Sequence, residues 1–144
     1  MGEEADRVTS RSTTPFRAAR IADIPPLPTD LVEAEWKPIR HHFGITAFGT
    51  NAYVARAAGE LVIEEHSEGP NGHEELYVVA TGRATFTIAG EEFDAPAGTL
   101  VAVTDPSIVR GAIAEEPGTT VLVVGAPRGE PFAPRNWELS RLDG

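Results

Sequence analysis

The sequence predicts a single all-β domain, and three observations lead to this prediction. The chain has 144 residues, which is close to the usual size of one domain. From Ile39 to Gly125 the apolar residues come in short runs, and Gly, Pro, Asn or Asp interrupt them about every 8 to 12 residues, as is typical of many short strands. No helical pattern interrupts these runs, so a sandwich or a barrel is the economical way to hide the sheet edges.

The N-terminal part of the chain contains little that predicts a strand. Residues 1–17 are charged and rich in Ser and Thr, and we expect them to form a flexible tail. Residues 18–38 include the IPPLP run, whose prolines favour an extended arm. After this run, Thr29 or Asp30 is a suitable cap for a short helix.

We expect the barrel to span residues 39–125 and to contain nine strands. The expected strands are 45–49, 51–57, 60–66, 74–81, 83–90, 91–97, 99–104, 109–115 and 119–125. The step from Ala89 to Gly90 suits a tight hairpin. Residues 126–144 contain three prolines, which exclude a central strand, and we expect an irregular tail with two apolar anchors, Phe132 and Trp137.

Charge and composition exclude several classes of partner and site. The formal net charge is -10, which disfavours nucleic acid and anionic membranes as partners. The chain has no cysteine, so disulfides, thiolate nucleophiles and Cys-based metal sites are excluded. No apolar run is long enough for a signal peptide or a membrane span, and we expect a cytoplasmic protein.

The stretch from His66 to Val103 resembles the cupin superfamily, whose first motif is G-x5-H-x-H-x3,4-E-x6-G. Glu75 is followed by six residues and then Gly82, which fits the second half of this motif. The order of strands and glycine turns over residues 45–125 also follows the cupin pattern. The resemblance implies a single jelly-roll β-barrel, a small-molecule ligand, a homodimer, and a divalent metal such as Fe, Mn, Ni or Zn.

The metal ligands that the resemblance implies are only partly present. His66 takes the position of the first His, Glu68 stands two residues later, and Glu75 takes the position of the Glu. The His of the second cupin motif is absent, because its position falls at or beside Arg110. His73 would share a strand face with Glu75, which gives the candidate metal ligands His66, His73 and Glu75, with Glu68 as a fourth.

Three residues are candidates for binding a substrate: Arg110, Tyr77 and Glu68. Arg110 could bind a carboxylate or phosphate through its guanidinium, and the alternative is an ion pair with Glu64, Glu68 or Glu75. Tyr77 should lie on the same strand face as Glu75, and these two residues are the catalytic candidates for proton transfer. The alternative for Tyr77 is ordinary packing in the core.

Three functions are compatible with these residues. The first is a metal-dependent cupin enzyme of the oxygenase, isomerase or lyase type that acts on a small molecule. The second is a metal-free, ligand-binding cupin, which the loss of the second-motif His and the presence of Arg110 favour. The third is a module whose barrel is filled by its own side chains and whose tail, through Phe132 and Trp137, contributes to a dimer surface. For His66 and His73, which flank a polar turn, simple solvation is the alternative to metal binding.

Overall fold

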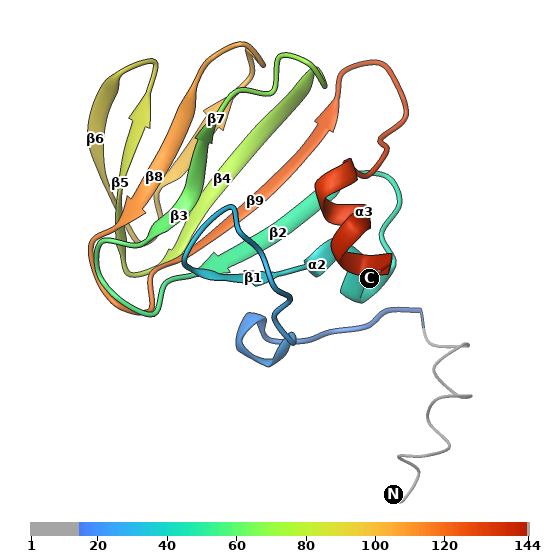
Figure 1. Cartoon of the computed structure of the whole chain (residues 1–144), viewed down its shortest axis with the longest axis horizontal. Coiled ribbons are helices and arrows are strands. Elements are labelled where there is room, and N and C mark those ends of the chain that lie inside the picture. The colour runs from blue at the N-terminus through green and yellow to red at the C-terminus, as the bar shows by residue number, and fades with distance from the viewer. Residues whose placement is uncertain (1–14, 144) are drawn as a thin grey trace, which may run out of the picture.

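A computed structural model describes residues 15–143 and shows two antiparallel β-sheets that form a jelly-roll barrel (Figure 1). The first sheet has the order β1-β2-β9-β4-β7, with β1 at Glu35–Lys37, β2 at Gly49–Val54, β9 at Thr120–Pro127, β4 at His73–Thr81 and β7 at Leu100–Val103. The second sheet has the order β3-β8-β5-β6, with β3 at Leu61–His66, β8 at Arg110–Ala114, β5 at Arg83–Ile88 and β6 at Glu91–Pro96. The all-β prediction is confirmed.

The core lies between the two sheets, where alternate residues of each strand are buried. Trp36 of β1, Tyr77 of β4 and Phe86 of β5 are its largest apolar side chains, and the rings of Tyr77 and Phe86 meet edge to face. The hairpin expected after β5 is present, with Ala89 and Gly90 both at positive φ. These two angles give the turn that matches the twist of the paired strands.

The strand predicted at 45–49 is wrong, as is the expectation that no helix interrupts the barrel region. Residues Ile39–Phe43 form the short helix α2, which begins after Pro38. Gly44 ends the helix in the left-handed conformation, and its N–H bonds back to the carbonyls of Arg40 and His41. This cap turns the chain, and strand β2 begins only at Gly49.

The N-terminal arm contributes more to the fold than its prolines suggest. The helix expected after Thr29 is absent, because the hydroxyl of Thr29 accepts a hydrogen bond from the N–H of Leu31 at 3.1 Å and forms a turn instead. The arm contains the short 3-10 helix η2 (Ile21–Asp23) and strand β1, which pairs with β2. The first sheet therefore begins before residue 39. The flexible tail expected at 1–17 lies, apart from its last three residues, outside the described residues.

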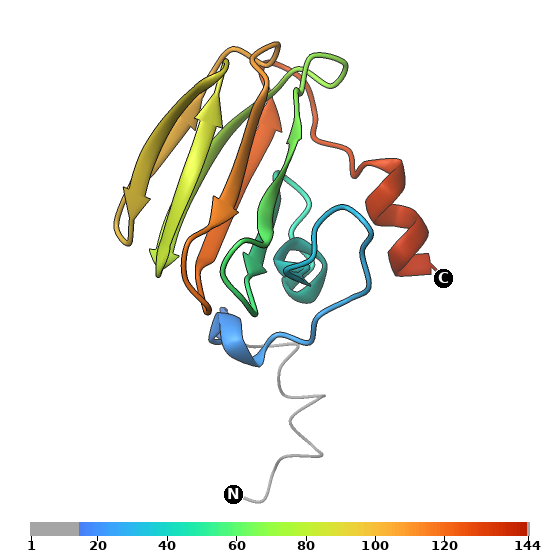
Figure 2. The same cartoon turned by 60° about the vertical axis from the view of Figure 1, so that its left-hand side comes forward.

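The C-terminal tail expected at 126–144 is irregular only in its middle, since strand β9 continues to Pro127 and residues Asn136–Asp143 form helix α3. The helix begins two residues after Pro134, the last proline of the chain. It lies beside α2 and the first strands of the barrel (Figures 1 and 2). Trp137 packs on Trp36 with ring centroids 5.1 Å apart, and Glu138 forms an ion pair with Arg40 at 2.6 Å. No helix among the described residues has the length and apolar character needed to cross a membrane.

Candidate functional site

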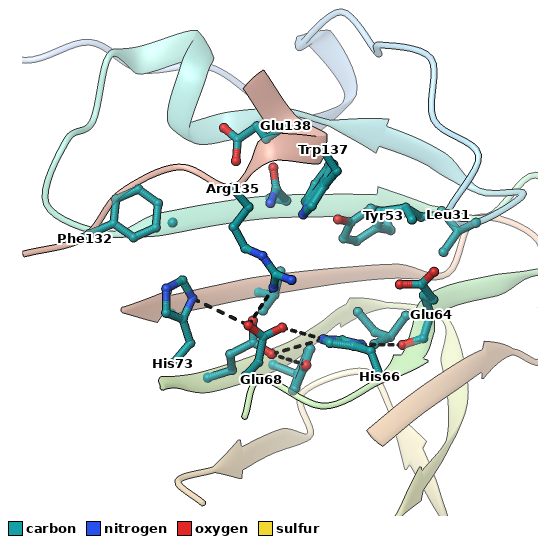
Figure 3. Close-up of a pocket in the computed structure, with 18 residues that line it drawn as sticks. Leu31, Tyr53, Glu64, His66, Glu68, His73, Phe132, Arg135, Trp137 and Glu138 are labelled. Atoms are coloured by element: carbon teal, nitrogen blue, oxygen red, sulfur yellow. Dashed lines mark hydrogen bonds and ion pairs between the residues drawn. The ribbon is translucent and has the colours of Figure 1, made fainter. Parts of the chain in front are cut away.

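The barrel has an open cavity of about 260 Å³ near α3 and the N-terminal arm, both of which contribute to its lining (Figure 3). This volume lies just below the range of ligand cavities, roughly 300–1,000 Å³, and suits a molecule smaller than a typical drug. The lining combines aromatic rings with acidic and basic groups: Tyr53, Phe132, Trp137, His66, His73, Arg135, Glu64, Glu68, Glu75 and Glu138 are among its residues. The barrel is thus filled by its own side chains only in part, whereas the third function that the sequence left open expects it to be filled.

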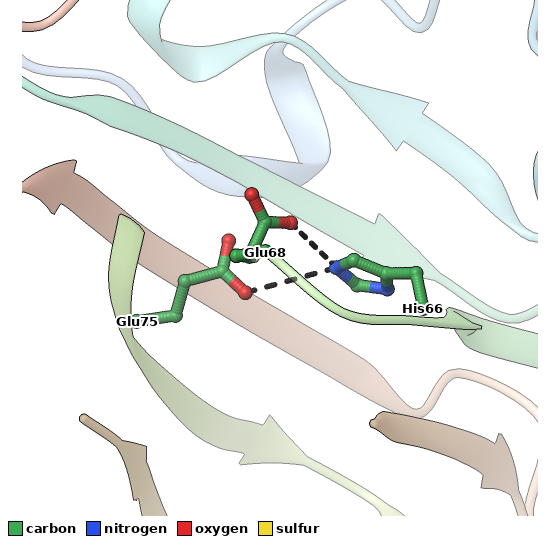
Figure 4. A group of neighbouring side chains, drawn as sticks. All are labelled: His66, Glu68 and Glu75. Atoms are coloured by element: carbon green, nitrogen blue, oxygen red, sulfur yellow. Dashed lines mark ion pairs between the residues drawn. The ribbon is translucent and has the colours of Figure 1, made fainter. Parts of the chain in front are cut away.

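Three side chains converge at one wall of this cavity (Figure 4). The Nε2 atom of His66 lies 2.7 Å from Oε2 of Glu68 and 3.8 Å from Oε1 of Glu75. One ligand atom from each of the three residues lies within 4.8 Å of the others. An imidazole nitrogen and two carboxylates at such separations form a set of donors that can surround one divalent cation.

Strand β3 fixes the orientation of the His66 ring. Its Nδ1 atom lies 2.6 Å from the backbone carbonyl of Glu64, so Nδ1 carries a proton and Nε2 faces the two carboxylates. Burial by itself would lower the pKa of His66, but the hydrogen bonds to Glu68 and to the Glu64 carbonyl, with the charges of Glu68 and Glu75, raise it above its ordinary value. The raised pKa therefore favours the protonated imidazole, whose Nε2 atom faces both carboxylates.

Glu68 lies in the turn between β3 and β4, and the backbone of this turn holds it in place. Its N–H donates to the carbonyl of Pro106 at 2.8 Å, and its own carbonyl accepts hydrogen bonds from Asn71 and Gly72. The residue is only 2% exposed, and Oε1 accepts a 2.7 Å hydrogen bond from Arg135. Burial favours the neutral carboxyl, but the hydrogen bond with His66 and the charge of Arg135 outweigh it, so the pKa of Glu68 is lowered.

Glu75 reaches the cavity because its partner on β9 is a glycine. Gly125 lies opposite Glu75 in the sheet, and a Cβ atom there would come within 2.9 Å of Glu75 Cγ. Tyr77, two residues further along β4, donates a hydrogen bond to Oε1 of Glu75, as their shared strand face predicts. Burial and the charge of Glu68 raise the pKa of Glu75, and the Tyr77 hydrogen bond with the charges of His66 and Arg110 offsets this only in part.

Arg110 lies in the barrel interior, paired across the second sheet with His66. Its side chain is 0% exposed, and Nη1 lies 3.4 Å from Oε1 of Glu75. Nε and Nη2 have no hydrogen-bond partner among the described residues, and Arg110 does not line the cavity. The ion pair that the sequence left open as an alternative is therefore present with Glu75, while the role of Arg110 in ligand binding stays a prediction.

His73 lies beside the three-residue group rather than within it. Its Nδ1 atom is 3.8 Å from Oε1 of Glu68, on the side of that carboxylate where Arg135 binds. Its ring packs against Phe132, and burial lowers its pKa, an effect that the charge of Glu68 offsets only in part. Of the predicted ligands, His66 and Glu75 come together, and Glu68 completes the group in place of His73.

Several lining residues were not predicted from the sequence. Asn51 and Tyr53 lie on the inner face of β2, and their alternation with Ala52 was a signal that the sequence offered. Arg135 reaches the cavity from the C-terminal tail, and nothing in its local sequence places it there. Glu64 lines the cavity beside a bulge in β3, which strand alternation alone does not reveal.

The donor set fits a divalent cation of the first transition row. Bonds of about 2.0–2.2 Å to nitrogen and oxygen place neighbouring ligand atoms about 3–4 Å apart, close to the 2.7 and 3.8 Å separations at His66. The second-motif His is absent, and the hard oxygen donors of Glu68 and Glu75 predominate. The residues that would hold the cation are His66, Glu68 and Glu75.

Comparison with known proteins shows similarity in structure. No protein-family model matches the sequence, and no curated protein matches it. Among solved structures, a cupin protein from Bacteroides fragilis is 17% identical with a TM-score of 0.59, covering 85% of this chain and 92% of that chain. A predicted oxalate decarboxylase from Thermotoga maritima is 17% identical with a TM-score of 0.60, covering 76% and 97%.

A third similar structure is a sugar phosphate isomerase of the cupin superfamily from Silicibacter pomeroyi. It is 15% identical with a TM-score of 0.61, and the match covers 76% of this chain and 74% of that chain. At these identities the likeness establishes the fold and leaves the reaction open. The two-sheet topology and these similar structures together show that the chain has the jelly-roll fold of the cupin superfamily.

Proposed function

We propose that the protein binds a small polar molecule in the barrel cavity with the help of one divalent cation held by His66, Glu68 and Glu75. The observation that carries this proposal is the convergence of His66 Nε2 with the two carboxylates at the cavity wall. The Glu64 carbonyl supports it, because it holds the proton on Nδ1 and directs Nε2 toward the cation position. Fe, Mn, Ni and Zn are the cations that such a donor set accepts.

The protein's own residues supply a means of holding a proton beside the cation position. Glu75 has a raised pKa, and the hydroxyl of Tyr77 donates to its Oε1 atom. These two residues are therefore the candidates for proton transfer to or from a bound molecule, with the proton on the Tyr77 hydroxyl while Glu75 binds the cation. A cation in the site would act as a Lewis acid on an oxygen atom of that molecule. Isomerase, lyase or oxygenase chemistry on a small organic molecule is the reaction class we propose.

Two of the similar structures support a small-molecule reaction. One is described as a predicted oxalate decarboxylase and another as a sugar phosphate isomerase. A further similar structure contains uridine. These descriptions apply to those proteins, and they agree with a cavity of this size in a barrel of this fold.

Metal analysis tests the proposal. The protein is purified without chelators, dialysed against Mn²⁺, Fe²⁺, Ni²⁺ or Zn²⁺, and its metal content is measured. We expect about one cation per chain for at least one metal. His66→Ala and Glu68→Gln should each lower the affinity at least about tenfold, and His42→Ala, which changes an exposed histidine of α2, should leave it unchanged. Substoichiometric metal with every cation would contradict the proposal.

A metal-free ligand-binding protein is the second candidate, and the burial of Arg110 favours it. Its guanidinium already provides a positive charge beside Glu75, at or beside the sequence position where cupins have a metal-binding His. In this case the protein would bind no cation. A small molecule found by thermal-shift screening would then bind equally well with and without a chelator. Arg110→Met should weaken that binding through the loss of its ion pair with Glu75, and unaltered binding would contradict this role of Arg110. Binding that is lost with a chelator would contradict the second candidate.

We also propose that the protein forms a homodimer. The outer face of the first sheet carries neighbouring apolar side chains on β4 and β7, with Leu76 paired to Ala102 and Val78 paired to Leu100. Leu76 and Leu100 are among the exposed large apolar residues. A contiguous apolar surface of this kind is typical of a protein–protein contact.

A further inference from the structure

The cavity has a second polar wall, opposite the three-residue group, whose side chains have groups without partners. In Figure 3, Tyr53 and Trp137 face His66 and Glu68 across the open space. Among the described residues, the Tyr53 hydroxyl, the Asn51 amide nitrogen and the Glu64 carboxylate have no hydrogen bond or ion pair. All three residues line the cavity.

Strand β2 explains why two of these groups point into the cavity. Asn51 and Tyr53 are two residues apart on the strand, so their side chains share its inner face and start about 7 Å apart. The indole N–H of Trp36 donates to the Asn51 carbonyl oxygen at 2.8 Å, which fixes the amide and leaves its nitrogen free. Asn51 is 9% exposed and Tyr53 is 8% exposed.

The open space of the cavity gives these groups their surroundings. Among the described residues, the buried side-chain atoms without a partner are Nε and Nη2 of Arg110, so the three groups of this wall keep access to the cavity. Water satisfies such groups there, and a molecule that displaces this water must offer hydrogen-bonding groups in its place.

Glu64 joins this wall because β3 is an edge strand with irregular pairing. The pairing register between β3 and β8 shifts between Leu61 and Ile63, and again between Ile63 and His66. Such bulges turn side chains out of the regular alternation. The carboxylate of Glu64 points toward Leu31 and Tyr53, while its carbonyl remains bonded to His66 (Figure 3).

The free groups differ in hydrogen-bonding character, and this difference defines the ligand class. The Glu64 carboxylate only accepts, the Asn51 amide nitrogen only donates, and the Tyr53 hydroxyl does both. Hydroxyl groups satisfy all three, because each hydroxyl can donate and accept. We infer that the ligand is a neutral, polyhydroxylated molecule of the sugar or polyol class, bound by Glu64, Tyr53 and Asn51. The ring of Trp137 offers an apolar face beside it.

The charges around the cavity favour a neutral molecule over an ion. Four carboxylates line the cavity, and Arg135, the arginine of the lining, is already bound to Glu68. An anionic group at the Glu64 wall would therefore meet repulsion. A cationic amine would satisfy Glu64 but would leave the Asn51 donor without an acceptor. The inference rests on the proposal that the barrel cavity is the ligand site, and it names the ligand class for the wall opposite the cation position.

Saturation-transfer NMR with neutral monosaccharides tests the inference. The probes are D-glucose, D-mannose, D-galactose, D-xylose and D-ribose, with D-glucuronate and D-glucosamine as the charged counterparts. We expect at least one neutral sugar to bind, and we expect Glu64→Gln to lower the affinity for this sugar about tenfold or more. Tyr53→Phe should lower the same affinity about threefold to tenfold. Glu65→Gln, which changes the exposed neighbour on the same strand, should leave it unchanged.

Three results would overturn the inference: binding of no neutral sugar, binding of a charged probe alone, or an unchanged affinity in Glu64→Gln. A cation titration of the same samples separates this inference from the proposed function. Glu64→Gln keeps the carbonyl that orients His66, so its cation affinity should match that of the unaltered protein. If a cation binds and no sugar does, the ligand class is wrong and the cation site stands. If a sugar binds and Glu64→Gln weakens its binding, while no cation binds in the titration, the ligand class stands and the cation site is wrong.

Discussion

The imidazole of His66 has different partners on its two nitrogen atoms, and these partners determine its chemistry. Nδ1 is held by the Glu64 carbonyl, and Nε2 lies between Glu68 and Glu75. A proton on Nε2 would donate to Oε2 of Glu68 at 2.7 Å, and its charge would attract Oε1 of Glu75 at 3.8 Å. A cation in the same place would replace this proton. It would bind Nε2 of His66 and one carboxylate oxygen each of Glu68 and Glu75. The site is therefore expected to exchange a proton for a cation.

This exchange predicts that cation affinity depends on pH. The pKa of His66 is raised above its ordinary value of about 6.5, so the proton stays on Nε2 to a higher pH than in a free histidine. The pKa of Glu75 is also raised, which adds a second competing proton at lower pH. We expect the apparent affinity for Zn²⁺ or Mn²⁺ to fall as pH decreases from about 8 to 5, by up to about tenfold per unit below the pKa of His66. Calorimetric titration at several pH values measures the apparent cation affinity, and an affinity that stays constant with pH would contradict the exchange.

At the scale of residues, the sequence predicted part of the site. The cupin-like spacing identified His66 and Glu75, and strand alternation correctly placed Tyr77 on the face of Glu75. Glu68 was ranked below His73, because the course of the turn between β3 and β4 depends on the contact with the Pro106 carbonyl. Such a contact between residues far apart in the sequence leaves no local pattern.

At the scale of elements, the contact between β4 and β9 makes room for Glu75. We expect Gly125→Ala to lower the free energy of unfolding by about 1–3 kcal/mol, since its Cβ would lie 2.9 Å from both Glu75 Cγ and the Glu74 carbonyl oxygen. It should also lower cation affinity, because Glu75 must move. Urea unfolding and cation titration measure the two effects. Gly69→Ala is the matched control, since its Cβ would meet nothing closer than 3.7 Å, and equal behaviour of the two variants would contradict this account.

Helix α3 covers one side of the cavity, and its attachment can be followed through Trp36. The chain has two tryptophans, so Trp137→Phe leaves the fully buried Trp36 as the only tryptophan signal. Acrylamide should quench this signal weakly. Adding Arg40→Met removes the partner of the buried Glu138, and we expect α3 to detach and quenching to increase about twofold or more. Quenching that stays the same in the double variant would show that the ion pair does not hold the helix.

The elements that the sequence predicted well are the strands between β3 and β9, where glycine turns and alternating apolar residues agree. The elements it missed are α2, β1 and α3, each of which depends on tertiary contacts. Strand β1 exists because it pairs with β2, and α3 is held by contacts of Trp137 and Glu138 with the arm and α2. Short segments of this kind have too little intrinsic preference to be predicted locally.

At the scale of the whole molecule, the outer face of the first sheet predicts self-association. We expect a homodimer in light scattering at micromolar concentration, with the apolar side chains of β4 and β7 in the contact. Leu100→Glu should give a monomer, because it places a charge in this surface. Leu139→Glu changes a comparably apolar, exposed residue on α3 and should leave the dimer intact. A monomer in the unaltered protein, or a dimer that persists in Leu100→Glu, would contradict the prediction.

The central claim is that His66, Glu68 and Glu75 form a cation site at the wall of the barrel cavity. Anomalous diffraction from crystals of the protein loaded with Zn²⁺ or Mn²⁺ tests it most directly. We predict one anomalous peak about 2.0–2.3 Å from His66 Nε2 and from a carboxylate oxygen of both Glu68 and Glu75. The absence of a peak between these three side chains, with the His66 to Glu68 ion pair and the Arg110 to Glu75 contact unchanged, would contradict the claim.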